Sequence, residues 1–215
     1  VRDGHYGYSD SHEPLHGFRN SDISTFVPSV RWLAEQGIWV LRMGKVMKPP
    51  LVVEHPRVID YAFRADRSDF LDVWLMAHSS GCISTATGLD SVAHVYRRPI
   101  LYLNAMPLGA WSSFTWCTWV PKDLREIRSG RILSAQEHLN RMYGKSVDYS
   151  AAGIEVVALT PDEVLQEVQD WWTSLLDQPS DSQADNDLQQ RFIDLCKNSP
   201  ISNMKHGFIH PKARI

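Results

Sequence analysis

Residues 82–103 read CISTATGLDSVAHVYRRPILYL, and this stretch decides the fold class. Residues 82–84 have the length and apolar character of a short strand, and residues 88–97 follow as a helix. Pro99 ends the helix, and residues 100–103 form a second apolar strand. A strand, a helix and a strand at these intervals are typical of a parallel sheet wrapped by helices.

The same alternation extends upstream. Residues 22–36 carry a helical stripe of apolar side chains, and Gly37 follows as a stop signal. Residues 38–41 form a short apolar run of strand length, and residues 58–59 indicate another strand. We therefore predict a Rossmann-like α/β domain with helices on both faces, in which strands 38–41, 82–85 and 100–103 are parallel in one sheet.

A further helix is predicted after Ser68 or Asp69, either of which can cap it. Its apolar residues leave little polar face, so the helix is expected to be buried. They are Phe70, Leu71, Val73, Trp74, Leu75 and Ala77.

Downstream, residues 104–133 are predicted to be a long aromatic-rich loop region with a strand at 117–120. Its tryptophans, Trp111, Trp116 and Trp119, are interpreted either as a stacking surface for a base or sugar or as core filling. Two helix starts follow as capping boxes. They are Ser134 with Glu137, and Thr160 with Glu163.

The end of the chain differs in composition. Residues 177–188 are acidic and turn-rich, which predicts a surface linker, and a helix near 186–197 and a basic tail follow. We therefore divide the chain into a Rossmann-like domain at 1–176 and a linker, helix and tail at 177–215.

The overall composition excludes several classes of protein. Of the 215 residues, 43% are hydrophobic and 22% charged, which argues against bulk disorder, collagen and a coiled-coil rod. A net charge of −3 argues against general nucleic-acid binding. No apolar run approaches the roughly 20 residues of a membrane span, and no secretory leader is visible. We expect a cytoplasmic protein without a membrane span, and peripheral membrane association stays open.

Cysteine and histidine patterns do not indicate a metal site. Cys82, Cys117 and Cys196 are widely spaced and include no C-x-x-C pair, and the nine histidines form no H-E-x-x-H motif. We expect three thiols, no metal and no cofactor.

The loop at residues 84–90 (STATGLD) is the first candidate site. Between a strand and a helix, backbone N–H groups and threonine hydroxyls can face an anion, and a pyrophosphate fits this role. The alternative is that Thr87 caps the helix and Asp90 completes a short capping box. The P-loop pattern G-x-x-x-x-G-K-[ST] is absent.

Basic side chains near other element ends are the second candidate. Arg42, Gly44 and Lys45 follow the strand at 38–41, where a doubly wound sheet presents its ligands. The alternative is a pair of solvated turn residues. Arg2 and Asp3, and residues 19–22 (RNSD), add further Arg and carboxylate groups near element ends, although an Arg beside an Asp is usually a surface ion pair. A G-x-S-x-G nucleophile elbow is absent.

Several of these stretches resemble a family of bacterial glycosyltransferases linked to surface-polysaccharide synthesis. The matching stretches are 1–6 (VRDGHY), 18–45, 58–63, 67–104 and 159–172, with RMGK, SDFLD and STATGLDS the most specific motifs. More distantly, residues 1–3 resemble the strand-end Arg of GDP-fucose-using transferases. Residues 85–93 resemble the diphosphate-binding helix start of heptosyltransferases.

The resemblance implies the nucleotide-sugar-binding half of a metal-independent GT-B glycosyltransferase, whose N-terminal acceptor-binding half is missing from this chain. The donor is a nucleoside-diphosphate sugar and the acceptor a glycan or lipid-linked glycan. The departing diphosphate must be stabilised as its charge develops. Asp3 is the candidate general base, and the predicted binding residues are Arg2, Arg42, Gly44, Lys45, Thr85, Thr87, Gly88 and Asp90. The competing hypothesis is a non-catalytic nucleotide- or glycan-binding module or partner domain.

Overall fold

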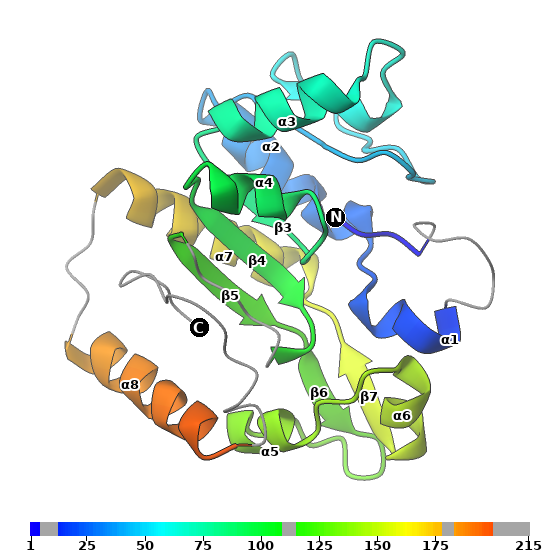
Figure 1. Ribbon diagram of the computed structural model, residues 1–215, viewed down its shortest axis with the longest axis vertical. Coiled ribbons are helices and arrows are strands. Elements are labelled where there is room, and N and C mark those ends of the chain that lie inside the picture. The colour runs from blue at the N-terminus through cyan, green and yellow to red at the C-terminus, as the bar shows by residue number, and fades with distance from the viewer. Residues whose placement is uncertain (5–12, 109–114, 178–182, 200–215) are drawn as a thin grey trace.

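A parallel three-stranded sheet forms the centre of the molecule (Figure 1). The computed structural model describes residues 1–4, 13–108, 115–177 and 183–199. Strands β3 (Cys82–Ser84), β4 (Ile100–Ala105) and β5 (Cys117–Pro121) pair in the order β3-β4-β5. Ile100 lies opposite both Cys82 and Cys117 in the register.

Helices cover both faces of this sheet, as its middle strand shows. Leu101 and Leu103 of β4 pack in one core cluster with residues of α2 (Val27–Glu35) and α7 (Pro161–Asp177). Ile100 and Tyr102 point the other way and pack with residues of α3 (Asp69–His78) and α4 (Asp90–Val95). All of β4 is buried, as expected of a parallel strand covered on both sides. The predicted α/β class, with parallel strands and helices on both faces, is confirmed.

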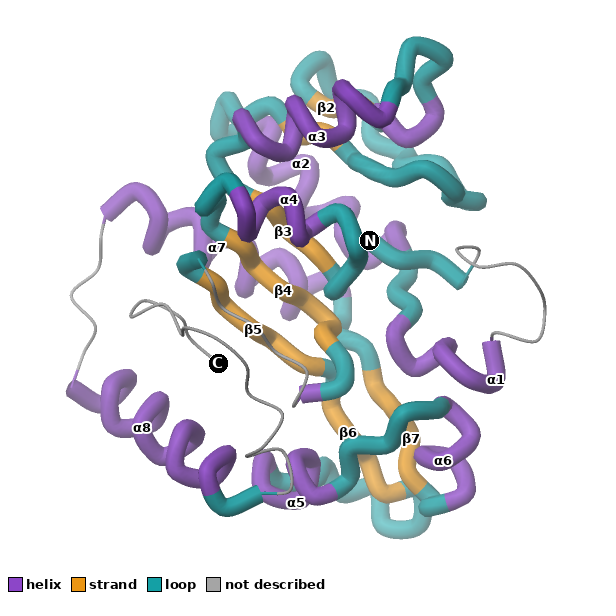
Figure 2. Tube along the Cα trace, viewed as in Figure 1, coloured by secondary structure: helices purple, strands orange, loops and turns teal. Residues whose placement is uncertain are grey.

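The first two strands form a sheet of their own (Figure 2). Strands β1 (Val40–Leu41) and β2 (Val58–Ile59) pair in parallel with each other. The prediction of one sheet containing strands 38–41, 82–85 and 100–103 is therefore wrong. The N-terminal segment contacts the residues that follow both sheets, since Arg2 N donates to Thr85 after β3 and Lys48 N after β1 donates to Asp3. Val1 packs on the same core cluster as Val40 and Ile83.

The segment predicted as one helix at 22–36 starts with a 3-10 turn, and α2 itself begins at Val27 and ends before the predicted stop signal Gly37. The Asp22 carboxylate accepts a hydrogen bond from Ser24 N at 2.8 Å and caps the 3-10 turn η2 (Ile23–Phe26), which leads directly into α2. The helix is followed by Gly37, whose φ of +89° lies in the left-handed region that glycine adopts without steric cost.

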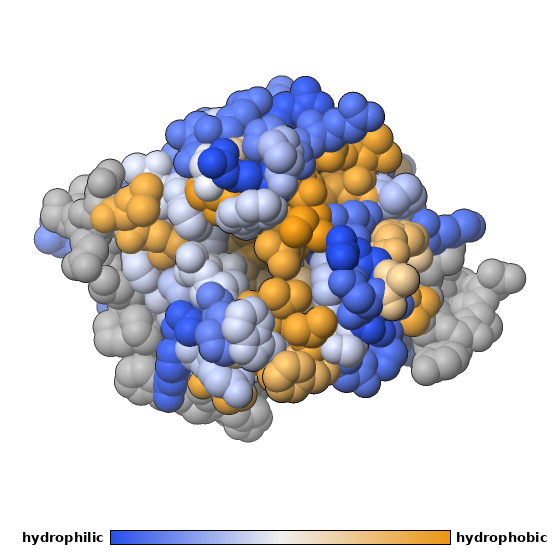
Figure 3. Space-filling model, turned by 90° about the horizontal axis from the view of Figure 1, so that it is seen from above, coloured by the Kyte–Doolittle hydropathy of each residue, from blue (hydrophilic) through white to orange (hydrophobic). Residues whose placement is uncertain are grey.

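Helix α3 is capped as predicted but is not buried as predicted. Ser68 Oγ accepts from Leu71 N at 3.1 Å. Met76 and Ala77 are buried, whereas Phe70 is 73% exposed and Trp74 46% exposed. The helix is apolar on most sides, but only one side meets the sheet and α4. Seen from above, apolar side chains gather in a band on this end of the molecule (Figure 3).

An antiparallel pair of strands extends the structure below the central sheet. Strands β6 (Asp123–Glu126) and β7 (Ile154–Val157) pair with Asp123 opposite Val157. Helices α5 (Ala135–Asn140) and α6 (Ser146–Ala151) lie between them in sequence. Sequence reasoning assigned residues 123–126 to a loop and predicted no strand at 154–157, so both strands are corrections.

Both predicted capping boxes are confirmed. The Ser134 side chain accepts from Glu137 N, and the Glu137 carboxylate accepts from Ser134 N. In the second box, Thr160 N donates to Glu163 Oε2 at 2.7 Å and Glu163 N donates to Thr160 Oγ1 at 3.3 Å. These contacts satisfy amide groups that a helix start leaves without an intrahelical partner.

Short elements at the N-terminus pack on the lower part of the structure. Helix α1 (Glu13–His16) leads into η1 (Gly17–Arg19), and a third 3-10 turn, η3 (Tyr61–Phe63), follows β2. Phe18 N donates to Ser146 Oγ at 2.9 Å, and the Phe18 ring lies against Tyr149. This anchoring fixes the position of the adjacent Arg19.

Helix α8 (Gln183–Lys197) packs on α5 through a small core that contains Phe192, Cys196 and Leu139. It begins at Gln183, so the second half of the predicted linker 177–188 is helical instead. The basic tail lies outside the described residues, and the division at residue 176 stays a prediction.

The three cysteines are buried as thiols. Burial raises the pKa of Cys82 and of Cys117 to about 12, so neither is an ionised nucleophile near neutral pH. Among the helices of the described ranges, none is both long and apolar enough to cross a membrane.

Candidate anion-binding site

The carboxyl ends of β3, β4 and β5 meet at one edge of the central sheet. In Figure 1 their arrowheads point to the side of the molecule on which the N-terminus and α1 lie. Ligands of open α/β sheets bind outside this edge. The loop that follows β3 carries three of the predicted binding residues, Thr85, Thr87 and Gly88, and a fourth, Asp90, begins the helix α4 that follows it.

The N-terminal segment connects the loops that follow β1 and β3. Arg2 N donates to Thr85 Oγ1 at 2.8 Å, and Ser21 N donates to Arg2 O at 2.8 Å. On the other side, Asp3 Oδ2 accepts from Lys48 N at 2.9 Å. The structure therefore brings the predicted residues Arg2, Asp3 and Thr85 together. Their contact depends on tertiary structure, since Arg2 and Thr85 are 83 positions apart.

The loop after β3 is organised by the carboxylate of Asp90. Asp90 Oδ2 accepts from Ser84 Oγ and from Thr87 N, each at 2.7 Å. This is the carboxylate half of the capping-box alternative. The Thr87 amide, which could face a phosphate, is thus occupied by a side chain of the protein. Gly88 is exposed, and a Cβ there would meet no heavy atom within 4 Å.

Arg42 is directed away from this loop. Its side chain is buried, and Nη1 donates to Pro49 O at 2.7 Å and to Asp60 Oδ2 at 3.3 Å. The guanidinium carbon lies 5.5 Å from the centre of the Phe63 ring. Asp60 Oδ2 also accepts from Leu51 N at 2.7 Å. These contacts give Arg42 a structural role in holding the segment after β1 against η3.

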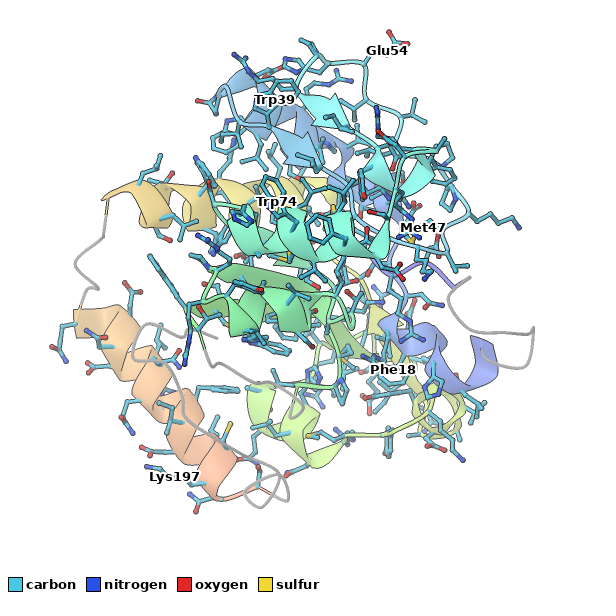
Figure 4. The ribbon with its side chains drawn as sticks, turned by 45° about the horizontal axis from the view of Figure 1, so that its top comes forward. Phe18, Trp39, Met47, Glu54, Trp74 and Lys197 are labelled. Carbon is cyan, nitrogen blue, oxygen red and sulfur yellow. The ribbon has the colours of Figure 1, made fainter. Side chains whose placement is uncertain are left out.

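Lys45 and Gly44 likewise lie outside the loop after β3. Lys45 Nζ is 3.1 Å from Asp69 Oδ1 in an exposed ion pair at the start of α3. A Cβ on Gly44 would lie 2.8 Å from Met47 Cγ, and the φ of Gly44 is +156°. Figure 4 shows Met47 and Phe18 on the same side of the molecule, with Lys197 on the opposite side.

Arg19 is a member of the site that sequence reasoning noted only as part of a possible surface ion pair. Its Nη2 donates to Ala86 O at 3.1 Å. The Nε atoms of Arg19 and Arg2 are buried and have no hydrogen-bond partner among the residues that the structure describes. Burial and then the positive charge of Arg2 lower the pKa of Arg19, and Asp90 partly offsets them. The sequence signal that could have identified Arg19 is Asp22, which lies where a helix cap is expected. Because the Asp22 carboxylate caps the turn η2, it does not serve as the ion-pair partner of Arg19.

The ends of β4 and β5 contribute further polar groups. Lys122 follows β5, is buried, and donates through Nζ to Asn20 O. Asn104 lies in β4 with a φ of +55° and accepts from Leu159 N through Oδ1 at 2.8 Å. Within the described ranges, Asn104 Nδ2 and Ser21 Oγ are buried without a hydrogen-bond partner. Sequence reasoning did not single out Lys122, and it included Ser21 and Asn104 only within the stretches 19–22 and 67–104.

Asp3 is positioned as an acceptor within the fold. It is 7% exposed, and its carboxylate receives the Lys48 amide. A general base must reach the hydroxyl that it deprotonates. To act as the base, the buried Asp3 carboxylate would have to give up its hydrogen bond from Lys48 N and contact the hydroxyl of the acceptor glycan.

The aromatic residues beneath the loop fill the core. Tyr102 stacks on Trp119 with ring centres 4.2 Å apart, and Tyr102 Oη lies 2.8 Å from His94 Nε2. Burial raises the pKa of Tyr102 and lowers the pKa of His94, so both are neutral near pH 7. Core filling is therefore the interpretation that holds for Trp119, and Trp111 lies outside the described residues.

The chemistry of this edge suits an anion. The Arg19 guanidinium donates to Ala86 O in the loop after β3, and Arg2 lies close enough for its positive charge to lower the pKa of Arg19. Within residues 1–4, 13–108, 115–177 and 183–199, no group of three or more His, Cys, Asp or Glu residues could hold a metal ion.

Comparisons with known proteins identify no relative. The chain matches no protein-family model, and no curated protein or solved structure is significantly similar to it. The functional argument therefore depends on the residues and their geometry.

Proposed function

We propose that the chain binds a nucleoside-diphosphate sugar at the carboxyl edge of its parallel strands. It would transfer the sugar to a glycan or lipid-linked glycan in the cytoplasm, as the donor-binding half of a metal-independent GT-B glycosyltransferase. The observation that supports this proposal best is the placement of Arg2 and Arg19 beside the loop after β3. The motifs of residues 1–6, 18–45 and 67–104 support it through their resemblance to such enzymes.

The reaction would break the bond between the anomeric carbon and the β-phosphate oxygen. The electron pair of that bond stays on the departing diphosphate, the acceptor oxygen bonds to the anomeric carbon, and the acceptor proton passes to a base. Arg2 and Arg19 would stabilise the negative charge that develops on the diphosphate. Asp3 is the candidate base in this chain.

A thermal-shift panel of UDP, GDP, CMP, dTDP and ADP tests donor binding. A ligand at 100 times its dissociation constant adds about 2.7 kcal/mol to the free energy of unfolding, which gives a measurable shift. A nucleotide that raises the melting temperature is then supplied as its sugar conjugate, and release of the nucleoside diphosphate is followed with and without glycan acceptors. Absence of any shift across the panel contradicts the proposal.

The burial of Asp3 favours a second candidate function, a non-catalytic nucleotide- or glycan-binding module. Such a module would bind nucleoside diphosphates or glycans without hydrolysing or transferring the sugar. Binding without turnover, in the presence of acceptor, would support this alternative.

A further inference from the structure

We propose that Arg2 and Arg19 form one site for a dianion of the pyrophosphate class, in which the two guanidinium groups bind two adjacent phosphoryl groups. The inference rests on the proposed function and deepens it, because it assigns recognition of the diphosphate to Arg19 with Arg2. These residues replace Arg42, Lys45 and the helix start in that role.

The backbone places the two arginines beside the same loop. Ser21 N, two residues after Arg19, donates to Arg2 O at 2.8 Å and joins the two segments. Arg2 N donates to the hydroxyl of Thr85, and Arg19 Nη2 donates to the carbonyl of the next residue, Ala86. The two arginines therefore belong to adjacent segments, and Arg2 is bound to the loop through its backbone amide and Arg19 through its guanidinium.

Each arginine retains hydrogen-bonding capacity that the protein does not use. The Nε atoms of Arg2 and Arg19 are both buried, and neither has a partner in the part of the chain that the structure describes. Buried donors without partners are rare in native proteins, and a bound ligand is one explanation for them. A phosphoryl oxygen accepts the paired N–H groups of a guanidinium in a bidentate arrangement.

The two guanidinium groups lie close enough for their positive charges to repel each other. The pKa of Arg19 is lowered by burial and by Arg2, which is the effect of two neighbouring positive charges. Asp90 is the carboxylate that offsets this effect, but its Oδ2 is bound by Ser84 Oγ and Thr87 N. A ligand with two negative charges would neutralise both guanidinium groups.

Two polar groups of the loop are already engaged by the protein. Thr87 N is bound to Asp90, and Thr85 Oγ1 accepts from Arg2 N. The helix that follows, α4, is short. The positive charge that would bind an anion at this loop therefore comes from Arg2 and Arg19.

The test is calorimetry on the full chain with inorganic pyrophosphate and inorganic phosphate. We expect pyrophosphate to bind at least about tenfold more tightly, because phosphate can satisfy only one guanidinium fully. Arg19→Gln keeps an amide donor for Ala86 O but removes the charge, and should weaken pyrophosphate binding roughly 10- to 150-fold. Arg2→Gln should act in the same direction. Arg64→Gln, which changes an exposed arginine paired with Asp66, is the matched control and should leave affinity unchanged.

Thermal unfolding separates ligand binding from a structural role of Arg19. Free Arg19→Gln should melt no lower than the wild type, because the substitution removes repulsion with Arg2. Pyrophosphate should raise the melting temperature of the wild type and not that of the variant. Equal affinity for pyrophosphate and phosphate, or undiminished pyrophosphate binding in both Arg19→Gln and Arg2→Gln, would overturn the proposal.

The same titrations distinguish this inference from the proposed function. A nucleoside diphosphate that binds no more tightly than pyrophosphate would contradict nucleotide recognition and leave the dianion site standing. If pyrophosphate does not bind at all, the dianion site is wrong, and the transfer assay then judges the proposed function on its own.

Discussion

Arg42 and Arg19 are both arginines of the first 45 residues, and they differ in what surrounds them. Arg42 has a carboxylate partner in Asp60 and donates to Pro49 O, within the segment that follows β1. Arg19 lies beside another arginine and a carboxylate that is bound elsewhere. The comparison teaches that an arginine near a strand end holds the fold when an acid is built in to receive it. Where the nearby carboxylate accepts hydrogen bonds from other groups, as Asp90 does, we infer that the arginine can bind a ligand.

The largest expected effect is on the free energy of unfolding and tests the structural role of Arg42. Arg42→Ala should lower the free energy of unfolding by about 3 kcal/mol, because it leaves the Asp60 carboxylate largely buried without its cation. Urea denaturation measures this loss.

The matched control for Arg42 is Lys45→Ala, which removes the cation of an exposed pair. It should change the free energy of unfolding by less than about 0.5 kcal/mol. Equal losses of stability in the two variants would show that the burial of Arg42 does not make its ion pair more important for stability than the exposed pair of Lys45.

A smaller effect is expected where the N-terminal segment joins the loop after β3. Thr85→Val removes the hydroxyl that accepts from Arg2 N and leaves that amide without its partner. We expect a loss of about 1–2 kcal/mol in the free energy of unfolding, together with weaker pyrophosphate binding, because Arg2 loses its anchor. Chemical denaturation and calorimetry measure the two effects.

Thr87→Val serves as the control for Thr85. At that position the backbone amide, and not the hydroxyl, binds Asp90, so the substitution keeps the contact that shapes the loop. If Thr87→Val impairs pyrophosphate binding as much as Thr85→Val does, the anchoring of Arg2 by Thr85 is not the cause.

The smallest expected effect concerns the charge around Arg19. It is a gain in pyrophosphate affinity, whereas the substitutions of Arg42 and Thr85 cause losses. Asp90→Asn keeps an oxygen that can accept from Thr87 N but removes the negative charge that offsets Arg19. Pyrophosphate affinity should rise roughly threefold at low ionic strength, and the gain should shrink as salt is added. Calorimetry at two salt concentrations measures it, and a fall in affinity would contradict the assigned electrostatics.

The parts of the fold that were predictable depend on contacts between near neighbours. The capping boxes at Ser134 and Thr160 and the cap at Ser68 need only three or four consecutive residues, which the sequence displays directly. The buried strand β4 is likewise visible as an apolar run.

The parts that were missed depend on distant contacts. Strand β6 carries only one buried residue, Leu124, so its sequence lacks the alternation of a half-buried strand. Its pairing with β7, about thirty residues later, decides its structure. The exposure of Phe70 on α3 was missed for a related reason, because an apolar helix does not indicate which of its sides will meet the sheet.

The sequence by itself determined the alternation of strands and helices, the parallel pairing of β3 with β4 and the helix starts, because backbone preferences, apolar runs and caps act over a few residues. Only the tertiary structure decided which cations gather at the strand ends. Arg2 meets Thr85 across 83 positions, and Arg19 meets Ala86 across 67. The role of a charge depends on burial and on the groups that surround it, and those groups come from segments whose proximity exists only after the chain has folded.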